Sequence, residues 1–178
     1  MIQSKADYLR YLEADRKAHK ITLKRPKLFG YHEWKFQRLM RKLEYINNCK
    51  KDNILFKPIY YCLKFRYKRK QLKLGFTIPI NVFGEGLNIA HVGTIVVNPN
   101  CVVGKNCRIH VCVNIGGTDN NVPKIGDNVY IGPGAKIFGS IQIADGIAIG
   151  ANAVVNKSFL ERSTTIVGSP ARVVSKRK

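Results

Sequence analysis

An aliphatic residue returns at every sixth position through the second half of this chain. A period of six fits neither an α-helix, with its period of about 3.6, nor a strand with one buried face, with its period of about 2. It is typical of a parallel β-helix built of hexapeptide turns, so the repeat predicts the architecture. The repeating residues are Val97, Val103, Ile109 and Ile115, followed by Ile125, Ile131, Ile137, Ile143, Ile149 and Val155.

Small residues accompany the repeat. Glycine often follows the aliphatic residue, and a small or apolar residue often stands four places after it. Cys101 and Cys107 occupy that fourth place, so we interpret them as apolar fillers of the core, with a nucleophilic cysteine as the alternative. The chain has five cysteines and no CxxC pair, which argues against a disulfide framework.

Two irregularities interrupt the repeat. Phe83, Ile89 and Ile95 keep one frame, which slips by two residues before the repeat resumes at Val97. A longer gap before Ile125 predicts a four-residue insertion that loops out around residues 119–123. Three hexads make one coil, so the repeat predicts about four coils, whose flat faces need cover. Self-association of the chain would supply that cover.

Residues 1–75 are predicted to form a basic α-helical region, and residues 76–178 the β-helix. We expect a first helix from about Ser4, capped with the help of Asp7, to about Lys20. A second helix should cover about residues 31–47, and a third about residues 53–74, with Gly75 as its stop. The third places Tyr60, Leu63 and Tyr67 among lysines and arginines.

The positive charge is concentrated in residues 1–75. Of the formal net charge of +20, this region carries +15, from 21 Lys and Arg against 6 Asp and Glu. Such a surface attracts anionic partners. We expect the helices to pack on the β-helix or on a partner subunit, with an anionic membrane surface as a further partner and no nucleic acid. With no signal peptide and no apolar stretch long enough to span a bilayer, a soluble cytoplasmic location is expected, with a peripheral position at the inner membrane face as an addition.

Two histidines of the repeat region are candidates for chemistry. His91 and His110 lie off the inward positions and three hexads apart, which is one coil, so both should lie on the same side of adjacent coils. A histidine is suited to remove a proton from a hydroxyl near neutral pH. A zinc site is disfavoured, because zinc takes three or four protein ligands and only these two histidines lie in the repeats.

Five segments of the repeat region have a distinctive sequence: residues 88–97 (NIAHVGTIVV), 113–118 (VNIGGT), 123–126 (PKIG), 131–137 (IGPGAKI) and 167–172 (VGSPAR). Through these segments the repeat region resembles the serine acetyltransferase branch of the hexapeptide acyltransferases. The likeness covers about residues 76–178, and both irregularities of the repeat fall where that family has them.

The resemblance implies a left-handed β-helix, a homotrimer and acetyl-CoA bound in a groove between subunits. His91 falls on the family's catalytic histidine, which takes the proton from the acceptor hydroxyl during direct attack on the thioester. Backbone N–H groups near Gly116 and Gly117 are expected to stabilise the oxyanion. The residues implied for acetyl-CoA binding are Gly117, Thr118, Ala135, Ala151, Asn156, Lys157 and Arg172. For Ala135 and Ala151 the alternative is hexad filling, and for Arg172 it is a solvated residue near the end of the chain.

The chain departs from the family where the acceptor would bind. Ala90 stands in place of an Asp directly before the histidine, and Asn121 in place of an Arg that serves the serine carboxylate. A further Asp that would support the imidazole is replaced by Phe76. Without these charged partners serine should be a poor acceptor. His110 is the expected substitute for the carboxylate beside His91, with Asn81, Glu85 and Asn114 as alternatives.

The sequence therefore predicts an acetyl-CoA-dependent O-acetyltransferase that acts on a sugar or glycan hydroxyl in bacterial surface-polysaccharide synthesis, with His91 as general base, His110 beside it and no metal. The first alternative is a serine O-acetyltransferase of cysteine biosynthesis. The second is a non-catalytic β-helix assembly module with a basic docking face. A zinc β-helix of the carbonic anhydrase type is the least favoured.

Overall fold

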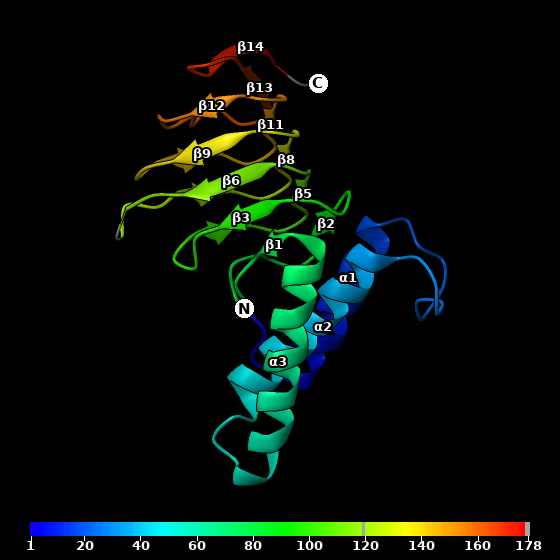
Figure 1. Ribbon diagram of the computed structural model, residues 1–178. Helices are drawn as coiled ribbons and strands as arrows, with labels where there is room; N and C mark the ends of the chain where they lie inside the picture. The colour runs from blue at the N-terminus through cyan, green and yellow to red at the C-terminus, as the bar shows by residue number, and fades with distance from the viewer. Residues whose placement is uncertain (119, 177–178) are drawn as a thin grey trace.

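The chain folds into three helices followed by a stack of short parallel strands, as the computed structural model of residues 1–118 and 120–176 shows (Figure 1). The helices are α1 (Lys5–Ala18), α2 (His32–Cys49) and α3 (Lys57–Leu74), with the 3₁₀-helix η1 (Ile54–Phe56) before α3. Their predicted positions are confirmed to within a few residues. The N–H of Asp7 donates to Ser4 Oγ at the start of α1, and Gly75, with φ of 74°, ends α3.

The strands form three sheets, which are the three faces of the β-helix. Sheet A has the order β1-β3-β6-β9-β12, sheet B the order β10-β7-β4, and sheet C the order β14-β13-β11-β8-β5-β2. Pairs within them are parallel apart from β13 with β14, which form an antiparallel hairpin at the end of the stack. The strands are β1 (Phe76–Thr77), β2 (Asn88–Ile89), β3 (Ile95–Val97), β4 (Val102–Val103), β5 (Arg108–Ile109), β6 (Val113–Gly116), β7 (Lys124–Ile125), β8 (Tyr130–Ile131), β9 (Lys136–Phe138), β10 (Gln142–Ile143), β11 (Ala148–Ile149), β12 (Val154–Val155), β13 (Thr164–Val167) and β14 (Arg172–Lys176).

The strand register explains both irregularities of the repeat. Ile137 pairs with Val155, three hexads further along the chain, which is the ordinary coil. Ile115 pairs with Ile137, and this spacing exceeds three hexads by the length of the predicted four-residue insertion. The insertion is thus confirmed by the register, although Asp119 within it lies outside the described residues. The repeat also extends further than expected. In the described part of the chain sheet A has five strands, because β1 adds a coil before Phe83, where the count of about four began.

The two-residue slip lies earlier than the repeat alone suggested. Ile95 pairs with Val113 at the ordinary spacing of three hexads, whereas the spacing between Ile89 and its partner Ile109 is longer by the slip. The two extra residues therefore lie between Ile89 and Ile95, and not between Ile95 and Val97. They lengthen the turn that carries His91.

The interior of the β-helix is filled by the repeating aliphatic residues, all of which are buried. Glycine follows many of them because the coils lie in direct contact. A Cβ at Gly104 would come within 2.6 Å of the backbone of Gly126 in the next coil. Cys101 and Cys107 are buried in the same interior, and burial raises the pKa of their thiols to about 11 and about 12. These two cysteines are therefore core fillers, because a nucleophile needs the thiolate.

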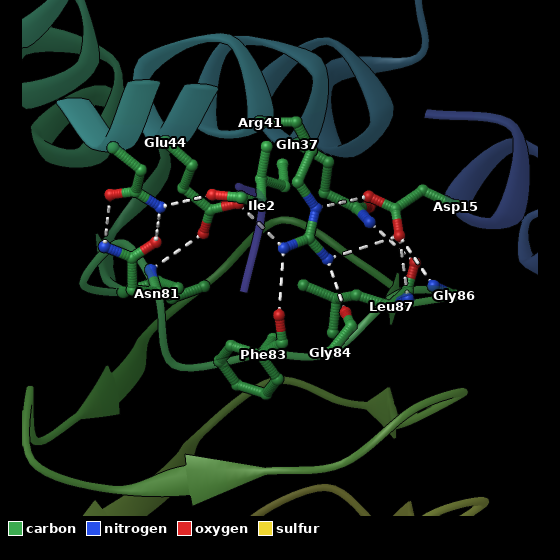
Figure 2. Close-up of polar contacts among 12 residues, drawn as sticks. Ile2, Asp15, Gln37, Arg41, Glu44, Asn81, Phe83, Gly84, Gly86 and Leu87 are labelled. Carbon is green, nitrogen blue, oxygen red and sulfur yellow. Dashed lines mark hydrogen bonds and ion pairs between the residues drawn. The ribbon is translucent and has the colours of Figure 1, made fainter. Parts of the chain in front are cut away.

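The helices meet the first coil through a buried polar group around Arg41, which we call the Arg41 cluster (Figure 2). Arg41 of α2 donates to Asp15 Oδ2 (2.9 Å), to Glu44 Oε2 (3.0 Å) and to the carbonyls of Phe83 (2.9 Å) and Gly84 (2.6 Å). Asp15 of α1 accepts in turn from the N–H groups of the first coil. Those donors are Gly86 and Leu87, both at 2.9 Å.

Candidate active site

His91 and His110 lie side by side at the corner between sheets C and A, which we call the histidine corner. His91 is in the turn from β2 to β3, and His110 is in the turn from β5 to β6 one coil away. The centroids of their rings are 5.8 Å apart. The geometry that the repeat predicted for this pair is confirmed, while their chemical roles stay predictions.

The longer turn is what distinguishes His91 from its neighbour. Ala90 and His110 occupy equivalent places, since the N–H of each donates to the next coil, to Ile109 and Ile131 respectively. The extra residues after Ala90 carry the His91 side chain outward, where it is exposed. An exposed imidazole is accessible to a substrate hydroxyl, and the His110 ring lies next to that of His91.

His110 has the environment of a group that stays neutral. Within the described part of the chain its Nε2 is buried and has no hydrogen-bond partner. Burial, with Arg108 and His91 nearby, lowers the pKa of His110 below its ordinary value. The Tyr130 ring packs edge-on against it, with centroids 5.2 Å apart. A neutral imidazole can donate from one nitrogen and accept at the other, so His110 can orient His91 or a bound acceptor.

A groove of about 320 Å³ follows the outer face of sheet A and is lined by residues of β3, β6 and β9. Along it, Val96, Asn114 and Lys136 stack in register on β3, β6 and β9. The Lys136 ammonium donates to Asn114 Oδ1 (2.6 Å) and to the carbonyl of Cys112 (2.7 Å), which closely follows His110 in the chain. Gly116 and Gly117 line the far end of the groove, where small residues leave room for a flexible chain.

The residues expected to bind acetyl-CoA fall on both edges of sheet A. Gly117 and Thr118 follow β6, and Asn156 and Lys157 follow β12, at the edge away from the histidines. Ala151 is exposed in the turn from β11 to β12, in line with the histidine corner.

The remaining two positions need separate description. Ala135 has no exposed surface, so its methyl group fills the core and only its backbone can contact a ligand. Arg172 is exposed at the start of β14. A single chain therefore does not gather the predicted set into one pocket.

Of the three alternatives to His110, Asn114 lies in the groove and accepts from Lys136, whereas Glu85 and Asn81 form their contacts elsewhere. Glu85 forms ion pairs with Arg10 (2.7 Å) and Lys105 (3.3 Å), in the turn that follows sheet B. Asn81 bonds to Glu44 and Asn48 at the helices. Phe76 is buried against Phe36, with ring centroids 4.9 Å apart.

Sequence reasoning missed Tyr130, Arg108 and Lys136 as parts of this site. Each lies on the outward face of a strand, at the position before an inward aliphatic residue. The three share that place in the hexad, and this is the signal that could have found them. Among the described residues, no three His, Cys, Asp or Glu side chains come together in a way that could hold a metal ion.

Comparison with known proteins relates the repeat region to transferases. Residues 123–157 match the family model described as bacterial transferase hexapeptide (six repeats). A serine acetyltransferase from Staphylococcus epidermidis is 41% identical over 95 residues, which are 51% of this chain and 44% of that protein. The matched part is thus less than half the length of this curated relative.

Solved structures extend the likeness to the helices. A serine acetyltransferase from Brucella abortus has 25% sequence identity and a TM-score of 0.76, and the match covers 98% of this chain and 71% of that one. A serine acetyltransferase in complex with CoA shares the fold at 24% identity, with a TM-score of 0.72 over 97% of this chain and 72% of that one. The three-helix region followed by a β-helix is therefore the architecture of serine acetyltransferases.

Proposed function

We propose that this chain transfers the acetyl group of acetyl-CoA to a hydroxyl oxygen, with His91 as the general base. The observation that carries the proposal is the exposed His91 beside His110, in the turns that lead into the strands of sheet A. The names of the similar proteins support the reaction class, and a protein of this fold has been solved with CoA.

The chemical step needs one proton acceptor and one oxyanion site. His91 takes the proton of the acceptor hydroxyl as its oxygen attacks the thioester carbonyl carbon. Backbone N–H groups near Gly116 and Gly117 stabilise the oxyanion that forms. The intermediate then collapses to the acetyl ester, and the departing thiolate takes the proton from His91. His110 lies beside the His91 ring and stays neutral during the step.

Serine is the acceptor that the relatives favour. The expectation of a sugar or glycan in surface-polysaccharide synthesis has no support among them, whereas the serine alternative does. Serine carries a carboxylate, and the Arg expected for it is replaced by Asn121. Lys136, held against Cys112 close to His110, offers a cation at the histidine corner instead. We therefore place serine first among the acceptors.

A neutral hydroxyl compound such as a sugar is the second candidate. Ala90 and Asn121 carry no charge, so they leave no ion-pair partner where the resemblance expects two. An uncharged acceptor avoids the desolvation of unpaired charges that serine would have to overcome. This candidate would require polar side chains of the histidine corner to recognise hydroxyl groups.

The active unit is proposed to be a homotrimer. The residues implied for acetyl-CoA binding lie on two edges of sheet A, and one chain does not close a pocket around them. Two copies that meet along these edges would bring Lys157 of one copy towards the histidine corner of the next. Symmetric closed oligomers are the common solution to such shared sites.

The test is His91→Ala, assayed for acetyl transfer to L-serine and to a panel of free and nucleotide-linked sugars. Activity should fall by at least about 100-fold, because the general base is lost. CoA binding by calorimetry and the sedimentation coefficient should not change. The matched control is His32→Ala, which removes an exposed histidine at the start of α2 and should leave activity intact.

The outcomes separate the candidates. Activity with serine alone supports the first acceptor, and activity with sugars alone supports the second. Near-normal activity of His91→Ala would contradict the assignment of the base. A wild-type chain that does not bind CoA would favour the non-catalytic module.

A further inference from the structure

Helix α3 has a second face that nothing in the described structure covers. Its first face is a stripe of buried residues, Tyr60, Leu63, Tyr67 and Leu74, which pack towards α2 and β1. The side of the helix opposite this stripe is exposed along its length. Figure 1 shows α3 at the outside of the helical group, leading directly into β1.

The exposed side of α3 contains an apolar stripe. Tyr61, Phe65 and Leu72 follow one another at spacings of four and seven positions, so they lie on one line along the helix. Their exposed fractions are 65%, 63% and 74%. Large apolar residues scattered singly on a surface need no explanation, but a line of them on one helix marks an interaction surface.

Cations flank this stripe on both sides. Lys64 and Lys68 lie along one edge, and Arg66, Arg69 and Lys73 along the other. We call these five cations, together with Tyr61, Phe65 and Leu72, the outer face of α3. On the side of Arg66, a groove between α2 and α3 is lined by Leu39, Phe65 and four cations, which are Arg66, Arg69, Lys70 and Lys73.

The cations around this groove are crowded. Burial, and the nearby charges of Lys35, Arg66 and Lys73, lower the pKa of the Lys70 ammonium. The sequence of α3 has seven Lys and Arg and no Asp or Glu. An anion in the groove would relieve this repulsion.

The charge decides which occupant fits the outer face. A second copy would bring two helices of the same strong positive charge into contact, and like charges in close contact are destabilising. An apolar line flanked by cations instead matches a bilayer surface, in which acyl chains accept the apolar groups and anionic headgroups meet the cations. None of the helices in the described part of the chain is long and apolar enough to cross a membrane.

We propose that the outer face of α3 docks on an anionic lipid bilayer. The helix lies in the plane of the membrane surface, with Phe65 and Leu72 directed into the headgroup region and a lipid phosphate in the groove beside Arg66 and Arg69. The β-helix is thereby held next to the bilayer. This inference does not depend on the reaction that the histidine corner performs.

The test is cosedimentation of the full chain with vesicles of phosphatidylcholine alone and of phosphatidylcholine with phosphatidylglycerol. Wild-type protein should bind the anionic vesicles and lose binding as NaCl is raised, because salt screens the attraction. The variant R66E/R69E should bind at least about 25-fold more weakly, since each cation near such a surface contributes roughly fivefold. F65S/L72S should bind about tenfold more weakly, because it removes buried apolar surface.

A matched control separates this face from general charge attraction. K124E/R162E makes the same change in net charge on the exposed surface of the β-helix and should bind nearly as the wild type does. Equal weakening of the control, equal binding to neutral vesicles, or no binding by the wild type would overturn the proposal. A further result would assign the face to a second copy of the chain and overturn the proposal. In it, the wild type does not bind vesicles, and F65S/L72S forms a smaller oligomer than the wild type by sedimentation velocity.

Discussion

The two regions of this molecule use different contacts to hold their interiors together. The β-helix repeats one contact, an aliphatic residue stacked on its equivalent in the next coil, as Ile131 lies on Ile109 and Ile149. The helices join the first coil through apolar contacts, such as the ring of Phe36 against that of Phe76, and also through the buried polar bonds of the Arg41 cluster. The β-helix is built from repeated apolar neighbours, whereas the junction with the helices adds buried directional bonds to its apolar packing.

The difference matters for how each region responds to change. The energy of an aliphatic stack depends little on the exact orientation of its side chains, since apolar contacts depend mainly on buried area and fit. The Arg41 cluster requires all of its hydrogen bonds. Arg41 and Glu44 are nearly fully buried, and each bond satisfies a polar group that has lost its contact with water. Asp15 and Glu44 raise the pKa of the Arg41 guanidinium even though burial acts to lower it. The orientation of the helices on the β-helix therefore depends on these polar residues as well as on apolar packing.

Asp15→Ala should give the largest loss of stability. Asp15 accepts from Arg41 and from the N–H groups of Gly86 and Leu87. Its removal takes one of two carboxylates from the buried Arg41 and leaves two buried donors without partners. We expect a loss of about 3–5 kcal/mol in the free energy of unfolding, measured by urea denaturation. Glu13→Ala is the control, because Glu13 forms an exposed ion pair with Arg16 and its removal should cost little stability. Similar small losses for both variants would show that the cluster does not join the regions.

Ile131→Ala should be less costly, at about 3 kcal/mol in the same measurement, because it opens a cavity without leaving a charge unpaired. Ile131 has no exposed surface and lies in the middle of sheet C. The matched control is Val102→Ala on the outer face of β4, where the side chain is 57% exposed and the cost should be small. A loss as small as that of the control would mean that neighbouring coils relax into the space and that stacking is less specific than the comparison implies.

The β-helix could be predicted from the sequence because its contacts repeat. The residues from Ile125 to Val155 give the same inward position six times. A single irregular residue therefore does not change the predicted register. The register of Ile89 could not be predicted in the same way. Its turn to Ile95 has two extra residues, and the repeat shows that a slip exists without showing which turn absorbs it.

The helical region and the candidate site were predictable to different degrees. Ser4 predicted the start of the first helix, and Gly75 predicted the end of the third. The residues around Arg41 do not predict its partners, because these lie as far away in the sequence as Gly84. His91 and His110 could be paired because both lie in the repeat. Lys136 was missed because its role depends on Cys112 in the preceding coil.

The smallest expected effect on stability concerns His110 in the histidine corner. Its Nε2 is a buried polar atom at the edge of the apolar β-helix interior. The pKa of His110 is lowered, so its neutral form is favoured in the folded state. As pH falls below about 6.5, the unfolded chain takes up a proton at this residue and the folded chain does not, so stability should fall with decreasing pH. His110→Gln cannot titrate and should lose less stability than the wild type between about pH 7.5 and about pH 5.5, measured by urea denaturation. His32→Gln is the control and should follow the wild type, and identical pH dependence of all three proteins would show that His110 titrates as an exposed histidine does.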